Sequence, residues 1–136
     1  MSDLMRTTVA IQRQLLEGFD GWMAAHGYTN RSEAMRDLIR KALVEAEWSD
    51  PAAEVIAVLS VVYEHARHTL AQELAHIQHE DHHAVLCSQH VHLDHETCLE
   101  VILMRGRAGQ LRRLADSIIA TRGVRAGKLT LMSKKL

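Results

Sequence analysis

The feature that most constrains the fold is one short strand-like segment near the start of the chain, with no second strand beside it. Residues 6–11 are rich in β-branched side chains and alternate Arg6, Thr8 and Ala10 on one face with Thr7, Val9 and Ile11 on the other. A lone strand leaves both of its edges unpaired. We therefore expect this strand to pair with the same strand of a second chain.

Two helices are predicted directly after this strand. Apolar residues recur at helical spacing up to Gly27, a residue suited to ending a helix, and Asn30 with Glu33 forms a capping box that begins the next helix. The expected buried face of the second helix comprises Met35, Leu38, Ile39, Ala42 and Leu43. One strand and two helices that dimerise make a ribbon-helix-helix module, whose two-stranded ribbon fits the major groove of DNA.

The only proline, Pro51, marks the predicted boundary between a domain of residues 1–50 and a domain of residues 51–136. The second domain has the βαββαβ pattern of a ferredoxin-like fold, so the whole chain is predicted to be α+β. The expected strands are 55–63, 84–93, 97–104 and 127–132, and the expected helices are 66–77 and 109–121.

Composition gives the chain enough apolar residues for a folded core, 47% in all, without an apolar run long enough to span a bilayer. The first residues do not have the pattern of a secretory signal, so we expect a cytoplasmic protein with no membrane partner. Two cysteines in a reducing compartment favour thiol or metal chemistry over a disulfide. Of the ten histidines, nine lie between His65 and His95, which indicates metal binding.

The strongest metal-ligand pattern is His90-Val91-His92 followed by Cys98. Side chains two apart in a strand project to the same side, about 6 to 7 Å from each other, and a hairpin brings Cys98 beside them. The parity of the strand puts Cys87 on the opposite face, as a small core residue rather than a ligand. Imidazoles and a thiolate suit nickel, copper, zinc or cobalt. A fourth ligand is expected from one of His79, His82 and His83, in the same chain or a neighbouring subunit.

The chain resembles the NikR family of nickel-responsive regulators. The resemblance lies in Gln78-His79, His90-Val91-His92 and Cys98-Leu99-Glu100, and it extends to Gly27-Tyr28, Asn30-Arg31-Ser32-Glu33-Ala34, Val62-Tyr63-Glu64-His65 and Arg122-Gly123-Val124-Arg125. It implies one square-planar Ni(II) per chain, bound by His90, His92 and Cys98 of one subunit and His79 of another. It also implies a homotetramer, a dimer of dimers built by ACT-type domains, that binds operator DNA and represses nickel-uptake genes.

Two further sets of binding residues are expected, one for a second cation and one for DNA. A second cation site, implied by the resemblance, would involve Glu33 and Asp37. On the ribbon, Arg6, Thr8 and Ala10 would face the bases, and amides near Arg31 and Ser32 would hold a phosphate. Ala10 departs from the polar residue usual in the family, so its contact with a base is expected to be weak or apolar.

The charge of the first domain limits unspecific DNA binding. Residues 1–50 hold six Arg and Lys against eight Asp and Glu. We therefore expect tight binding to need bound cations and the second ribbon of the tetramer.

Two other classes of function are an enzyme and a different kind of metal-binding protein. An enzyme would need an open metal position, and four protein ligands leave none. A ribbon-helix-helix regulator of another transition metal, or a nickel store or carrier, remains an alternative, although a carrier would not need the first domain. The remaining histidines of the rich stretch are expected at the surface or in secondary metal sites: His65, His68, His76, His82, His83 and His95.

Overall fold

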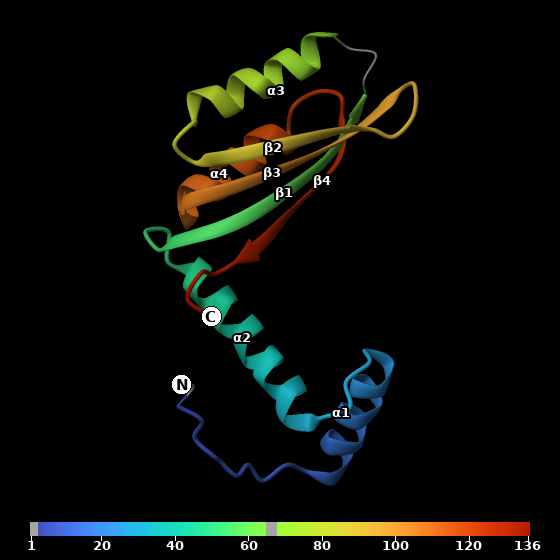
Figure 1. Cartoon of the computed structure of the whole chain (residues 1–136), viewed down its shortest axis with the longest axis vertical. Helices are drawn as coiled ribbons and strands as arrows, with labels where there is room; N and C mark the ends of the chain where they lie inside the picture. Colours follow the sequence, from blue (N-terminus) through green and yellow to red (C-terminus); the bar gives the residue numbers. More distant parts are fainter. Residues whose placement is uncertain (1–2, 65–67) are drawn as a thin grey trace. The chain divides into compact units, whose positions relative to one another are not determined.

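The computed structural model describes residues 3–64 and 68–136 (Figure 1). The chain divides into two compact units, Met1–Arg40 and Lys41–Leu136. This division falls inside a long helix, whereas the boundary expected from the sequence, between residues 50 and 51, falls just after that helix ends. Within the described ranges, no helix is long and apolar enough to cross a membrane.

The first unit contains helix α1, Arg13–Ala25, and the beginning of helix α2, Arg31–Ser49. Helix α1 ends because Gly27 takes a positive φ of 76°, which lets the amide of Tyr28 donate to the carbonyl of Met23 at 2.9 Å. Residues 3–12 form no helix or strand within the chain. The strand expected at residues 6–11 needs a second chain to pair with, and it stays a prediction.

Helix α2 begins with the cap expected from the sequence, in part. The Asn30 side chain accepts from the amides of Ser32 and Glu33, at 2.8 and 3.3 Å. Among the described residues, the Glu33 carboxylate does not accept the return hydrogen bond from the backbone amide of Asn30. Half of the capping box is therefore confirmed.

The apolar face expected on α2 is exposed within one chain, so its burial needs a second chain and stays a prediction. Leu38, Ile39 and Leu43 are 41%, 57% and 47% exposed, while Ala34 is fully buried. An apolar pattern indicates that a face needs cover, but it does not tell whether the cover comes from the same chain. In the described residues no element of the chain buries these three side chains.

The second unit has the expected order of strands and helices. Its elements are β1 (Glu54–Glu64), α3 (His68–Glu80), β2 (Val85–His92), β3 (Thr97–Arg107), α4 (Ala108–Ile119) and β4 (Val124–Met132). The strands form an antiparallel sheet in the order β2-β3-β1-β4. This confirms the βαββαβ pattern. The expected start of α3 at residue 66 lies outside the described residues, and β4 begins earlier than expected.

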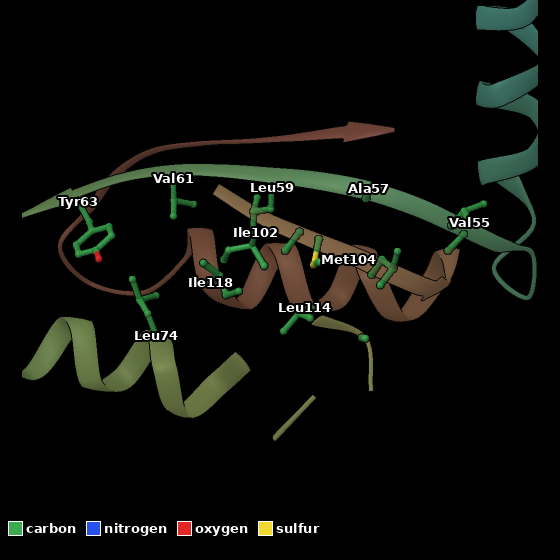
Figure 2. Packing of buried hydrophobic residues seen from close by; sticks show 14 of the residues in the cluster. Val55, Ala57, Leu59, Val61, Tyr63, Leu74, Ile102, Met104, Leu114 and Ile118 are labelled. Atoms are coloured by element: carbon green, nitrogen blue, oxygen red, sulfur yellow. The ribbon is translucent and has the colours of Figure 1, made fainter. Parts of the chain in front are cut away.

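The core lies between one face of the sheet and the helices α3 and α4. Alternate residues of β1, from Val55 to Tyr63, are buried, and Figure 2 shows their side chains pointing toward the helices. Trp48, in the last turn of α2, belongs to the same core and donates from its indole Nε1 to the carbonyl of Met132 at 3.0 Å. The end of α2 is thus anchored in the second unit.

The opposite face of the sheet is not covered by the described residues, and this corrects the expectation for Cys87. Cys87 does lie on the face opposite His90 and His92, but it is exposed. Val91 and Leu103, on the same outer face, are each 40% exposed. Strand parity assigned Cys87 to the correct face, but parity alone does not tell which face of a sheet is covered.

Candidate metal centre

Three neighbouring strands position the candidate ligands. In the register of the sheet, His92 of β2 pairs with Cys98 of β3, which in turn pairs with Tyr63 of β1. Two residues further along the same strands, His90 pairs with Glu100. Because side chains alternate along a strand, all five project to the face that α3 covers. The site therefore depends on the pairing of an edge strand with two inner ones.

The ligand atoms of His90, His92 and Cys98 all lie within 4.8 Å of one another. The Cys98 Sγ is 3.5 Å from Nδ1 of His92, and the two imidazole centroids are 4.9 Å apart. This is the only group of three or more potential metal ligands so close together among residues 3–64 and 68–136. The three side chains that the sequence singled out are thus brought together.

The environment of Cys98 favours its neutral form in the absence of a metal. Its side chain is fully buried, and burial raises the pKa of the thiol, an effect to which the carboxylates of Asp94 and Glu100 add. A metal ion binds the thiolate, so binding would displace this proton. Two imidazoles and a buried sulfur are borderline-soft donors, and this set fits Ni(II).

Tyr63 supports the histidine pair, a role that the sequence reading missed. Its hydroxyl is 2.7 Å from Nδ1 of His90, and the two rings meet edge to face. Burial, together with the charges of Glu100 and Cys98, raises the pKa of Tyr63, so its hydroxyl stays protonated near neutral pH. The alternation of the predicted strand could have indicated this role. It places Tyr63 on the buried face, and a buried tyrosine hydroxyl needs a hydrogen-bond partner.

A second buried contact joins α3 to the sheet beside the site. Nε2 of Gln78 donates to Oε1 of Glu100 at 2.9 Å, and these are the two buried polar residues among the described ones. Both belong to the motif that resembles NikR, but the sequence reading gave neither a role. Gln78 directly precedes His79, so this bond holds the turn of α3 that carries the fourth expected ligand.

His79 itself is not part of the three-residue group. It is exposed on the last turn of α3, where its ring lies 6.1 Å from that of His82. Its expected role as a ligand requires a second subunit and stays a prediction.

The other expected site residues lie in the first unit. Both carboxylate oxygens of Asp37 are engaged, by the Tyr28 hydroxyl at 2.9 Å and by Arg40 at 2.7 Å, while Glu33 is exposed. Arg6, Thr8 and Ala10 are exposed. The Arg31 guanidinium forms an ion pair with Asp20 at 2.6 Å, and the amide of Ser32 is capped by Asn30. The roles of these residues in binding a cation or DNA stay predictions.

Comparison with known proteins adds three findings. A family profile described as "NikR C terminal nickel binding domain" matches residues 56–132. A candidate nickel-responsive regulator of Solibacter usitatus is 49% identical over 131 residues, which are 96% of this chain and 94% of the relative. One from Solidesulfovibrio magneticus is 47% identical over 131 residues, with the same coverage of each chain.

A solved structure has a similar fold over part of the chain. An uncharacterized protein from Thermotoga maritima superposes with a TM-score of 0.52 at 15% identity, covering 57% of this chain and 96% of the other. This likeness concerns the fold alone.

Proposed function

Because the chain belongs to the NikR family of nickel-responsive regulators, we propose that it represses nickel-uptake genes by binding operator DNA when Ni(II) occupies a site of three histidines and one cysteine. The family is one of regulators and not of enzymes. The observation that carries the proposal is the convergence of His90, His92 and Cys98, whose ligand atoms lie within 4.8 Å of one another.

Each chain would hold one Ni(II), with His90, His92 and Cys98 as three of its ligands and His79 of a second subunit as the fourth. The exposure of His79 on α3 supports this arrangement, because a ligand offered to another subunit must reach out of its own. A thiolate and three imidazoles suit the square-planar geometry open to Ni(II). Sharing a ligand between subunits would make the tetramer and the metal site depend on each other.

The first unit would bind the DNA. In a dimer of two such units, residues 6–11 of both chains form the ribbon, with Arg6, Thr8 and Ala10 toward the bases in the major groove. Residues around Arg31 and Ser32 would approach the phosphate backbone. The exposure of the apolar face of α2 supports dimerisation, because three large apolar side chains there are about half exposed in one chain.

Nickel would act by changing which tetramer geometry is populated. An ion that binds one arrangement of the subunits better than another shifts the population toward it, and the favoured arrangement would place both ribbons on their half-sites. The proposal places the protein in the cytoplasm, where operator DNA is present. A second cation near Glu33 and Asp37 would offset the acidic balance of the first domain, and it would have to displace Tyr28 or Arg40 from Asp37.

An absorption titration with Ni(II) tests the metal site. The natural chain is expected to develop a thiolate-to-nickel charge-transfer band that saturates at one ion per chain. Cys98→Ala should lose the band, while Cys87→Ala, which removes the only other thiol, should keep it. An unchanged band in Cys98→Ala would show that the site is assigned wrongly.

A DNA-binding measurement then tests the regulatory step. Operator sequences are first selected from a random duplex library with nickel-loaded protein, and binding is compared with and without Ni(II) at equal salt. We expect the selected duplex to be bound much more tightly with nickel, and Arg6→Ala to weaken this binding. Equal affinity of metal-free and nickel-loaded protein would contradict the proposal.

The alternative of another metal is addressed with the same assay. The donor set also accepts Cu(II), Zn(II) and Co(II), and affinity alone favours copper. If the protein is a nickel regulator, Zn(II) should fill the site in its preferred tetrahedral geometry without producing tight DNA binding. Tight binding with Zn(II) or Cu(II) alone would favour a regulator of that metal.

A further inference from the structure

A second group of histidines lies at the carboxyl end of α3, outside the site described above. Helix α3 ends at Glu80, and the turn that leads to β2 contains His82 and His83 (Figure 1). Their ring centroids are only 3.9 Å apart, and both side chains are exposed. Two imidazoles in such proximity at the surface form a potential pair of metal ligands.

The His82 ring is oriented as a metal-binding imidazole usually is. Its Nδ1 faces the backbone carbonyl of His79 at 3.3 Å. A ring that donates from Nδ1 to a carbonyl has its proton on that nitrogen, so Nε2 keeps the lone pair that a metal needs. The metal-free chain therefore already favours the tautomer that would bind an ion through Nε2.

The turn that carries the pair is held on two sides. Gln110 of α4 donates to the carboxylate of Asp81 at 3.3 Å, and the amide of Arg105 in β3 donates to the carbonyl of Ala84 at 2.8 Å. Ala84 is itself buried. Ligands on an anchored turn lose little conformational entropy when they bind an ion, and this favours binding.

The local electrostatics also favour a cation. The carboxyl end of a helix carries a partial negative charge, and Glu80 and Asp81 add two carboxylates next to the pair. Nε2 of His76, one turn earlier in α3, lies 3.4 Å from Oε1 of Glu80.

We propose that His82 and His83 form a second transition-metal site, which binds Ni(II) or a similar borderline ion through two imidazoles. Water fills the remaining positions, so this site binds more weakly than a site with a thiolate and three imidazoles. It is independent of Cys98 and of the second subunit. The pair lies close to His79, whose ring centroid is 6.1 Å from that of His82.

The test counts ions bound to the full chain by equilibrium dialysis over a range of free Ni(II). The natural chain is compared with His82→Gln/His83→Gln and with a control, His76→Gln, which removes an exposed histidine of the preceding helix, α3. The double variant is expected to bind about one ion fewer per chain than the natural chain and the control, with the same affinity for the tightest ion. The thiolate charge-transfer band should keep its amplitude in all three.

The outcomes separate this site from the proposed function. If the double variant and the natural chain bind equal numbers of Ni(II) ions, the second site is overturned. It is also overturned if His76→Gln loses the same ion. If the natural chain shows no thiolate band but the double variant still binds one ion fewer, the second site stands and the proposed function fails. In Cys98→Ala, the ion bound by His82 and His83 should remain.

Discussion

The hydroxyl of Tyr63, on an inner strand, lies 2.7 Å from Nδ1 of His90, on the edge strand β2. The two residues are far apart in sequence and lie on strands separated by β3, where Tyr63 pairs with Cys98 and His90 pairs with Glu100. A hydrogen bond to one ring nitrogen fixes both the orientation and the tautomer of an imidazole. Tyr63 is therefore a positioning residue for the metal site.

Replacing Tyr63 by phenylalanine should weaken nickel binding without unfolding the protein. Loss of a hydrogen bond that orients a metal ligand typically lowers affinity about 10- to 100-fold. Competition with a chelator of known affinity measures the change. Tyr28→Phe is a matched control, since it removes the only other tyrosine hydroxyl, which bonds Asp37 in the first unit. Equal losses in both variants would argue against a positioning role.

The bond between Gln78 and Glu100 should contribute to the stability of the second unit. In Gln78→Ala, the buried Glu100 carboxylate loses a donor, and such a loss costs about 1 to 3 kcal/mol. Urea unfolding of the metal-free protein measures the change. Gln72→Ala on the exposed face of the same helix serves as the control and should have little effect. Similar unfolding midpoints for the two variants would contradict this account.

Gly127 allows β4 to pack closely against α4. A Cβ added to Gly127 would lie 2.5 Å from Cγ1 of Ile119 and 3.2 Å from Cγ1 of Val61. We expect Gly127→Ala to destabilise the protein by about 1 to 3 kcal/mol, the usual range for overpacking. Combining it with Ile119→Ala should cost less than the sum of the two single changes, because the second change removes the clash. Additive losses in thermal unfolding would show that Ile119 is not the obstacle.

The ion pair between Asp20 and Arg31 makes the first unit sensitive to acid. The hydrogen bonds from Arg31 lower the pKa of Asp20 in the folded chain. A carboxyl whose pKa is lowered by folding stabilises the fold above its unfolded pKa of about 3.9, and this contribution is lost as the pH falls through the folded value. Asp20→Asn should therefore differ from the natural chain at neutral pH and converge with it in acid. Circular dichroism of the helices against pH measures this, and a constant difference down to the lowest pH would contradict the assignment.

Much of the second unit was predictable because its signals are local. Alternation along 55–63 predicted a strand with one buried face, and the structure has β1 at Glu54–Glu64 with that alternation. The convergence of His90, His92 and Cys98 was predictable for the same reason. His90 and His92 share a face because side chains alternate along one strand, and a short turn brings Cys98 of the next strand beside them. Both relations depend only on residues that are close in sequence.

One prediction failed and another stays open because both depended on what covers a surface. Cys87 was expected in a core and is exposed, since the outer face of the sheet has no cover within the described chain. The apolar face of α2, including Leu38 and Ile39, is exposed within one chain, and its expected burial needs a second chain. Periodicity shows which residues share a face, but burial depends on the element or chain that packs against that face.

By itself, the sequence determined the order and type of the elements in the second unit and the three candidate ligands that meet in it, because these follow from alternation and short-range turns. Tertiary structure alone decided that Tyr63 and Glu100 support those ligands, that Gln78 holds α3 beside them, and that His82 and His83 lie in contact at the surface. Contacts between distant segments depend on strand order and side-chain rotamers, which local patterns do not specify.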